Sequence, residues 1–524
     1  MAVDLQAVVV RKIVSVNPAT GEVLRELECA GEAEVRGAVA RAAAAQGAWR
    51  ELGVRKRIAV LRAFQRRLQA KKSEVATVIT REAGKPLAET LTTEVLVVLD
   101  AARFLIENAW RLLRDEPLPH GNLATRLKRG RLLREPYGVI GIISPWNYPF
   151  SIPATETLAA LVAGNAVVLK PSELTPLVAL ELAQLLHESG VPKDVFQVVV
   201  GDGASGAALM QSPIDKLVFT GSVATGKRIA AAAAERLLPI VLELGGKDPM
   251  IVLDDADVDI ASSAAVWGAF VNAGQTCLSV ERCYVHRSLY EGFLQACAEK
   301  TKKLRVGYGE HGETDVGPMI HERQVHIVEA QVEDAKARGA RVLAGGTRLR
   351  ELGANFYLPT VLADVTHEMR IMREETFGPV LPVAAFGDDE EAVHLANDSE
   401  YGLAASVFTR NSERGEKLAR RIQAGTVMVN DVVSCFGISE APHGGIKASG
   451  VGRTHGRFGL EEMVRLKYLD SDLMPGMKKV WWYGYGESFR RQMEGLLDLQ
   501  FAGGLSARLR GAVHAAGVAR RKPT

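Results

Sequence analysis

The sequence predicts an α/β protein with two doubly wound parallel sheets, a β arm and a C-terminal tail. Short apolar runs alternate with helical patterns between residues 137 and 244, and a second alternation continues to about residue 425. Strands that alternate with helices are typical of parallel sheets. The length of 524 residues also exceeds what one hydrophobic core usually supports, so we expect two or three domains.

The first 135 residues have a different pattern. Residues 16–23 read as a strand, a turn and a returning strand around the sequence PATG. Helical patterns follow over 34–49, 57–70, 73–82 and 89–113. Residues 118–135 then show short alternating segments, which predict two strands that leave the helical body.

Polar residues follow the ends of the strands that we expect between residues 137 and 244. Expected strands are the apolar run before Pro145 and the ranges 165–169, 195–200, 216–219 and 239–244. Asn147, Lys170 and Glu173 follow two of these strands, and a glycine-containing turn follows Phe219. In doubly wound sheets, ligands bind outside the carboxyl ends of the strands. These residues are therefore candidates to face one crevice.

The turn after Phe219 has the sequence FTGSVATGKRIA and precedes an alanine-rich helix. Small residues at Gly221 and Gly226 would let a pyrophosphate approach the backbone and the helix N-terminus. The strict GxGxxG pattern is absent, so an ordinary glycine turn between a strand and a helix remains the alternative.

A candidate nucleophile is Cys277, in the stretch FVNAGQTCLS from 270 to 279. Gly274 allows a tight bend, and Asn272 and Gln275 are poor core residues, so packing alone does not explain the sequence. The alternative is an inert buried thiol, which is the commonest role of a free cysteine.

Composition excludes several classes of function. Lys and Arg number 64 against 62 for Asp and Glu, which gives no general attraction to nucleic acid. The five cysteines fit neither a disulfide framework nor a metal site, so we expect no metal and a reducing cytoplasm. No secretory signal or membrane-spanning run is evident.

Seven motifs together resemble the aldehyde dehydrogenase superfamily over roughly residues 15 to 470. They occur in the family's order, as PWNYP, LKPSE, FTGSxxTG, LELGGK, NxGQxC, EETFGP and PxGGxKxSGxGRxxG. One departure is His443, where many members carry Phe. The resemblance implies an NAD-binding domain (1–117 and 136–244), a catalytic domain (245–447), an oligomerisation arm (118–135 and 461–474) and a C-terminal extension (475–524).

The resemblance also assigns roles to residues. It implies that Cys277 attacks an aldehyde, that the amide of Asn147 stabilises the oxyanion, and that Glu243 is the general base that hydrolyses the thioester. The cofactor residues that it implies are Trp146, Lys170, Glu173, Gly221, Ser222, Gly226, Glu375 and Phe377. Structural roles remain as alternatives: a helix cap for Asn147, a paired strand end for Glu243 and a surface ion pair for Lys170 and Glu173.

The implied activity is NAD-dependent oxidation of an aldehyde to a carboxylic acid. A carboxylate at Glu173 disfavours the 2′-phosphate of NADP, which is the less favoured cofactor. Two alternatives remain: an enzyme that transfers the acyl group to coenzyme A, and an inactive binding relative. Tyr148, Phe436 and His443 predict a substrate pocket of mixed polarity, without naming the aldehyde.

The chain ends in a basic, aromatic extension. Between residues 475 and 524 there are nine basic and three acidic residues, with aromatic residues at Trp481, Trp482, Tyr483, Tyr485 and Phe489. We expect a homodimer or homotetramer, with the extension docked on its own oligomer. The alternative is peripheral membrane association through an interfacial helix, which the glycines of this segment disfavour.

Overall fold

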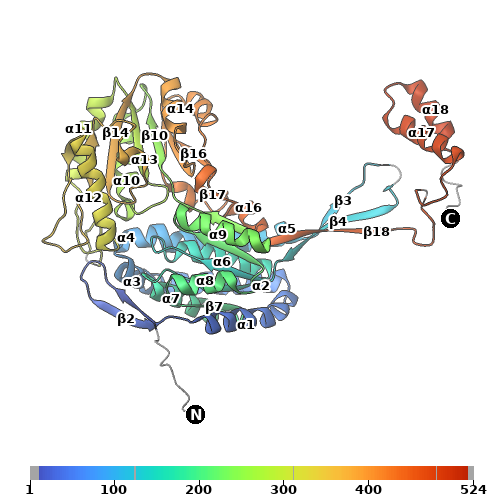
Figure 1. The fold of residues 1–524 in the computed structure, drawn as a ribbon, viewed down its shortest axis with the longest axis horizontal. Helices are drawn as coiled ribbons and strands as arrows, with labels where there is room; N and C mark the ends of the chain where they lie inside the picture. Colours follow the sequence, from blue (N-terminus) through green and yellow to red (C-terminus); the bar gives the residue numbers. More distant parts are fainter. Residues whose placement is uncertain (1–10, 123–124, 311, 480, 517–524) are drawn as a thin grey trace, which may run out of the picture. The chain divides into compact units, whose positions relative to one another are not determined.

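The computed structural model describes residues 11–122, 125–310, 312–479 and 481–516. Figure 1 shows the elements in order along the chain and confirms the predicted α/β architecture. The described chain divides into two compact units. The first runs up to Leu113 and from Pro136 to Val464, and the second contains Arg114–Glu135 and the residues from Arg465 onward.

The first sheet of the first unit has six strands in the order β17-β9-β8-β5-β6-β7. Their bounds are Gly450–Val451, Ile240–Glu243, Lys216–Thr220, Val139–Ile143, Ala166–Lys170 and Phe196–Val198. Every pairing is parallel except β17 with β9. All five residues of β6 are buried, as expected for a strand that is covered on both faces of a parallel sheet.

Helices cover this sheet and share its hydrophobic core. They are α1 (Glu32–Glu51), α2 (Val54–Ala70), α3 (Lys72–Ala83), α5 (Leu96–Leu113), α6 (Ser151–Ala163), α7 (Pro176–Glu188), α8 (Gly203–Gln211) and α9 (Val223–Arg236). The hairpin of β1 (Lys12–Val16) and β2 (Val23–Glu28) precedes them. Pro176 begins α7 and Gly164 ends α6 in the left-handed conformation, so local sequence sets these helix ends.

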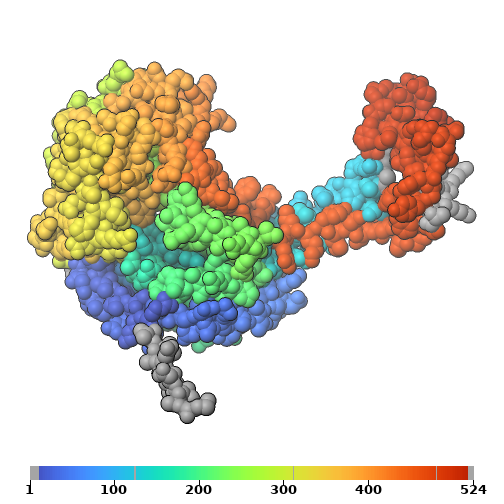
Figure 2. All heavy atoms as spheres, viewed as in Figure 1, coloured from blue at the N-terminus to red at the C-terminus, as the bar shows by residue number. Residues whose placement is uncertain are grey.

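The second sheet has seven strands in the order β12-β13-β14-β11-β10-β15-β16. Their bounds are Arg341–Ala344, Thr360–Ala363, Val380–Phe386, Val280–His286, Asp248–Val252, Ala404–Phe408 and Thr426–Val429. The helices of this part include α10 (Val258–Phe270), α11 (Tyr290–Lys302), α12 (Glu322–Ala337), α13 (Arg370–Arg373), α14 (Asp389–Asn397) and α15 (Ser412–Ala419). They bury a second hydrophobic core. In the space-filling view, the blue-to-green and yellow-to-orange parts of the chain form two sides of the first unit (Figure 2).

The predicted helix over residues 89–113 is interrupted in the structure. A short helix α4 (Leu87–Thr90) leads into a π-helical turn η1 (Leu91–Val95), and α5 follows. Within η1, Glu94 is buried and its carboxylate receives a hydrogen bond from the buried Lys85 at 2.6 Å and another from the backbone of Ser151. π turns are often found at functional sites, and this one lines a cavity that is described below.

The second unit is described by itself. Strands β3 (Glu116–Leu118), β4 (Lys128–Pro136) and β18 (Val464–Asp472) form a three-stranded sheet in the order β18-β4-β3. Two helices, α17 (Glu487–Phe501) and α18 (Leu505–Ala515), pack on each other. The break between them contains Gly503 and Gly504, as predicted, whereas Gly495 lies inside α17. A Cβ on Gly495 would lie 2.8 Å from the Gly511 carbonyl oxygen, so this glycine permits the helix crossing and does not interrupt the helix.

Among the described residues, every helix is too short or too polar to cross a lipid bilayer.

Candidate active site

Asn147 lies in the turn between β5 and α6, beside the segment that carries Cys277. It is buried, and its side-chain amide donates a hydrogen bond to the Gln275 carbonyl oxygen at 3.0 Å. Asn272 donates to the Asn147 carbonyl oxygen at 2.9 Å and so ties the two loops together. An amide NH₂ has two hydrogens, so the bond to Gln275 leaves Asn147 one donor for a ligand.

The bend before Cys277 has an unusual backbone. Asn272 and Ala273 adopt left-handed conformations with φ of 55° and 53°, inside the short helix η3 (Val271–Gly274). Gly274 has φ of 72°, and a Cβ there would overlap the Gly378 carbonyl group. Only glycine fits this close approach. The strained bend therefore presents Cys277 from a fixed backbone.

Cys277 is a free, partly exposed thiol. Burial raises its pKa well above the usual value, and the nearby carboxyl groups of Asp248, Glu375 and Glu243 raise it further. The resting side chain is therefore a neutral thiol, and a base must remove its proton before it can act as a nucleophile.

Glu243 is the last residue of β9 and is buried. Burial raises the pKa of its carboxyl group well above the usual value; Glu156 raises it further and Arg453 opposes the shift. Neither carboxyl oxygen has a hydrogen-bond partner in the described part of the chain. The predicted alternative of a strand end held by a salt bridge is disfavoured, because the basic group beside Glu243 is His443, with Nε2 at 3.8 Å from Oε2, and burial lowers the pKa of this imidazole to about 3.

A cavity of about 610 Å³ lies at the carboxyl ends of the first sheet's strands. All but one of the predicted catalytic and cofactor residues line it: Trp146, Asn147, Lys170, Glu173, Gly221, Ser222, Glu243, Cys277, Glu375 and Phe377. Gly226 does not line it. A Cβ on Gly226 would lie 2.5 Å from the Leu244 side chain, so this glycine allows α9 to pack closely on the strand end.

The cavity wall has features that suit a dinucleotide. Ser222 caps the N-terminus of α9, and Gly221 precedes it, so backbone amides and a helix dipole are available for phosphate. Glu173 and Glu375 add carboxyl groups to this wall, a type of side chain that can accept hydrogen bonds from hydroxyl groups, and burial raises the pKa of Glu375 to about 8. Lys170 contacts Glu173 at 3.4 Å. The residues present therefore fit NAD or NADP.

A buried ion pair holds the loop that carries Glu375 and Phe377. Lys247 donates to Glu281 at 2.6 Å, and the Glu281 carboxylate accepts the backbone N–H groups of Thr376 and Phe377, both at 2.8 Å. Sequence reasoning missed this support because the three segments are far apart in the chain. It also missed His321, Arg323 and Gln324, which line the cavity from the start of α12 without any motif to mark them.

A second cavity of about 270 Å³ reaches Cys277 from another side. Its wall consists of Thr92, Thr93, Val97, Tyr148, Ile152, Trp267, Val271, Thr276, Cys277, Leu278, Val433, Ser434, Phe436 and Gly437. None of these lining residues is Asp, Glu, Lys, Arg or His. Tyr148 and Phe436 line it as predicted, but His443 does not, so the wall is less polar than the sequence suggested.

No group of three or more His, Cys, Asp or Glu residues in the described ranges could hold a metal ion.

The comparisons with known proteins agree with this geometry. The family model for the aldehyde dehydrogenase family matches residues 6–469. The 4,4'-diapolycopene aldehyde oxidase of Methylomonas is 40% identical over 93% of this chain and 91% of its own length. The mitochondrial succinate-semialdehyde dehydrogenase of Arabidopsis thaliana is 40% identical over 86% of this chain and 85% of its own.

A solved structure, described as an E. coli NADP dependent enzyme, has a TM-score of 0.85 and 37% identity, and covers 88% of this chain and 95% of its own. The chain belongs to the aldehyde dehydrogenase family, and it is an NAD(P)-dependent enzyme that oxidises aldehydes.

Proposed function

We propose that this enzyme oxidises an apolar aldehyde to the carboxylic acid, with NAD as its preferred cofactor and a thioester on Cys277 as the intermediate. The observation that carries the proposal is the position of Cys277 in the walls of both cavities. One cavity has the polar groups that a dinucleotide needs, and the other is apolar. A thiol between them can bond to an aldehyde in one cavity while a hydride leaves toward the other.

Oxidation begins when Cys277, after losing its proton, attacks the carbonyl carbon and forms a hemithioacetal oxyanion. The free hydrogen of the Asn147 amide and the backbone N–H of Cys277 are the donors for this oxyanion, a contribution of about 3 kcal/mol per donor in comparable sites. NAD, when bound, supplies the acceptor for the hydride that this carbon loses. The product on the enzyme is a thioester of Cys277.

Glu243 then removes a proton from water, whose oxygen attacks the thioester carbon and releases the carboxylic acid. A carboxyl group with a raised pKa suits this role, because it binds the proton of water more strongly than an ordinary carboxylate does. Coenzyme A would replace water as the acceptor of the acyl group only if its thiol attacked the thioester before water did. Analysis of the products with and without coenzyme A tests this: free acid under both conditions supports hydrolysis, and an acyl-coenzyme A product contradicts it.

The substrate proposal rests on the uncharged wall of the 270 Å³ cavity. The carboxylate of an aldehyde such as succinate semialdehyde would lie there without a cation, at a cost of several kcal/mol. An aliphatic or aromatic aldehyde without charge gains from the same wall, at about 25 cal/mol per Å² of buried apolar surface. A panel of aldehydes of equal length with and without a terminal carboxylate tests the proposal, and higher kcat/KM for the charged members contradicts it.

The preference for NAD rests on Glu173, whose carboxylate would repel the 2′-phosphate of NADP. Lys170 lies 3.4 Å from that carboxylate and opposes this effect in part. The relative described as NADP dependent leaves both cofactors open for members of this family. Equal kcat/KM for NAD and NADP would contradict the proposed preference.

The predicted domain roles are part of the same proposal: cofactor binding for 1–117 and 136–244, catalysis for 245–447, and subunit association for 118–135 and 461–474. Support for the last comes from β3 and β18, which are the edge strands of their sheet, the position at which a strand of another subunit can add. We therefore propose a homodimer or homotetramer, and a monomer in light scattering would contradict it. The five free cysteines support a reducing cytoplasm.

For residues 475–524 we propose docking on the enzyme's own oligomer. Trp481, Trp482, Tyr483 and Tyr485 are exposed in the chain by itself, and so are Phe501, Leu505 and Leu509. Such a set of apolar side chains is typical of a surface that a partner covers. Binding to anionic vesicles by the full-length protein alone would favour the membrane instead.

A further inference from the structure

Behind Glu243 lies a third, small cavity of about 20 Å³, the volume that one water molecule needs. Its wall contains four acid–base side chains besides Cys277: Glu156, Glu243, His443 and His455. Three of them, Glu156, Glu243 and His443, are at most 5% exposed, and His455 is partly buried. A buried site with this many titratable groups needs an explanation beyond packing.

Each of the four side chains has a polar atom without a hydrogen-bond partner among the described residues. These atoms are Oε2 of Glu156, both carboxyl oxygens of Glu243, Nδ1 of His443 and Nε2 of His455. An unpaired buried polar atom destabilises the folded state, and a bridging water removes that cost. The cavity has both the volume and the polar wall that such a water requires.

The two histidines are held in fixed positions. His443 and Thr454 exchange backbone hydrogen bonds of 2.8 Å, and His455 Nδ1 bonds the Thr454 hydroxyl at 3.1 Å. Phe436 packs edge-on against both rings, with centroid distances of 5.2 Å to His443 and 4.6 Å to His455. The His443 Nε2 thereby lies 3.8 Å from Glu243 Oε2, a gap that a small shift or a water can close.

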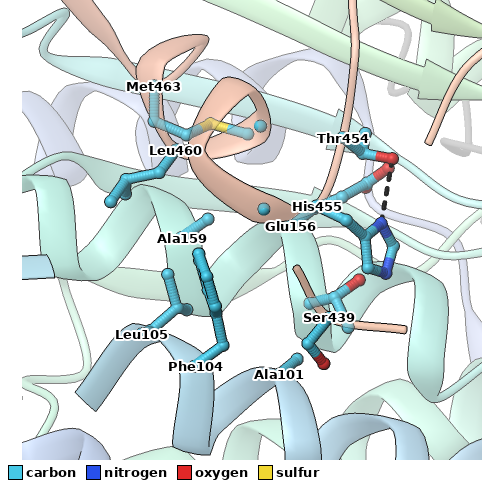
Figure 3. Close-up of a pocket in the computed structure, with 13 residues that line it drawn as sticks. Ala101, Phe104, Leu105, Glu156, Ala159, Ser439, Thr454, His455, Leu460 and Met463 are labelled. Atoms are coloured by element: carbon cyan, nitrogen blue, oxygen red, sulfur yellow. Dashed lines mark hydrogen bonds between the residues drawn. The ribbon is translucent and has the colours of Figure 1, made fainter. Parts of the chain in front are cut away.

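A neighbouring cavity of about 30 Å³ continues the path away from Cys277. It shares Thr155, Glu156, Thr454 and His455 with the 20 Å³ cavity. Figure 3 shows its Thr454, His455 and Ser439 on one side and Leu105, Leu460 and Met463 on the other. The polar residues of this second wall therefore extend the polar groups around Glu243 to the parts of the chain near α5 and α16 (Gly456–Glu461).

Burial shifts the pKa of each member of the cluster in the direction that favours its neutral form. Burial raises the pKa of Glu156 to about 8, against a smaller opposing effect of its Thr220 hydrogen bond. Burial lowers the pKa of His443 to about 3, with His455 and Arg453 adding to the effect, and lowers the pKa of His455 to about 4. Glu462 and Arg453 also face Glu243, with opposite effects on its pKa. A neutral imidazole can accept a proton at one nitrogen while it releases one from the other.

We propose that Glu156, His443 and His455 form a proton relay behind Glu243 that serves hydrolysis of the Cys277 thioester. This inference rests on the proposed function. Water gives a proton to Glu243 as its oxygen bonds to the thioester carbon, and the carbon–sulfur bond breaks with Cys277 leaving as the thiolate, which is the form that attacks the next aldehyde. Glu243 must lose that proton before the next turnover. The proton passes through the cavity water to His443 or Glu156, and on past His455, so one proton leaves for each acid formed.

His443→Phe tests the relay directly, because it introduces the aromatic residue that many members of the family carry. Formation and decay of the Cys277 thioester are followed separately by rapid quench and intact-mass spectrometry, in mixtures of H₂O and D₂O. We expect formation within about twofold of the wild type and decay slower by about tenfold or more, which is less than the roughly hundredfold or larger effect of losing the general base itself, because Glu156 still provides a path for the proton. A plot of the decay rate against the D₂O fraction should be curved for the wild type, because several protons move in the slow step. The same plot should be linear for the variant, because only one proton then moves.

Glu156→Gln keeps the size of the side chain and provides a second test, with the same expected slowing of decay. Met463→Leu, in the wall of the 30 Å³ cavity, removes no titratable group and is the matched control for packing. Unchanged thioester decay and an unchanged curve in both His443→Phe and Glu156→Gln would overturn the relay. Equal slowing of formation and decay would overturn it too, since that indicates a structural role. Failure of the proposed function would look different, because the wild type would then form no thioester on Cys277.

Discussion

The two large cavities that meet at Cys277 differ in how the chain builds them. The 610 Å³ cavity takes its walls mostly from loops at strand ends, where Lys170, Gly221 and Glu243 each end or follow a strand. The 270 Å³ cavity takes its walls from segments as far apart as Thr92 in η1 and Phe436. Strand-end loops form compact motifs, whereas a wall of scattered side chains has no sequence signature. The wall of the 610 Å³ cavity could therefore be predicted from the sequence, whereas most of the wall of the 270 Å³ cavity could not.

Cys277→Ala removes the group that both cavities share, and it should have the largest effect. We expect loss of turnover by roughly a thousandfold or more, because no covalent intermediate can form, while NAD binding stays nearly intact. Steady-state kinetics and calorimetric NAD titration measure the two effects. Cys435→Ala, at a buried thiol that is not among the residues lining either cavity, is the control. Turnover close to that of the wild type would contradict the role of Cys277 as the nucleophile.

Glu243→Gln should separate the two half-reactions. Hydride transfer needs no ionised carboxylate at this position, so we expect a burst of NADH and then a steady state slower by about a hundredfold. Stopped-flow absorbance of NADH measures both phases. A variant that shows neither burst nor turnover would indicate that Glu243 is structural.

Ser434→Arg places a cation in the uncharged wall of the 270 Å³ cavity. The ratio of kcat/KM for a carboxylated aldehyde over that for an uncharged one of equal length should rise by roughly tenfold or more, since the carboxylate gains a partner. Ser434→Thr keeps the wall uncharged and should leave the ratio as it is. An unchanged ratio in the arginine variant would mean that this cavity does not hold the substrate.

Glu173→Ser acts on the other cavity. Removal of one half-exposed carboxylate should raise the kcat/KM ratio of NADP to NAD by roughly fivefold, because such a contact is worth about 1 kcal/mol. Kinetics with both cofactors measure the ratio. The control is Glu173→Asp, which keeps a carboxylate at this position and should preserve the ratio. If the kcat/KM ratio of NADP to NAD is unchanged in the serine variant, other residues of the wall determine the choice of cofactor.

Deletion of residues 475–524 should have the smallest effect on catalysis, because the residues proposed for catalysis and cofactor binding all precede residue 475. We expect a folded enzyme with altered oligomer stability or a broader range of aldehydes, and unchanged binding to liposomes. Light scattering, the aldehyde panel and vesicle sedimentation measure these properties. Loss of vesicle binding with no other change would replace docking with membrane association.

The fold was largely predictable because its strands and helices carry clear local patterns. The buried run of β6 and the proline at the start of α7 determine those elements by themselves. The π turn at Leu91–Val95 could not be predicted, because it depends on the buried contacts of Glu94 with Lys85 and Ser151. The role of Gly495 inside α17 could not be predicted for a related reason, because it is set by the close approach of α18.

The sequence by itself determined the family, the α/β class and the residues at strand ends, because a motif keeps its members within a few positions of each other. Only the tertiary structure decided that the wall of the 270 Å³ cavity is uncharged and that His443 lies beside Glu243 and not in that wall. It also decided that Gly226 serves packing on Leu244. These outcomes depend on contacts between segments tens to hundreds of residues apart, which the order of residues along the chain does not record.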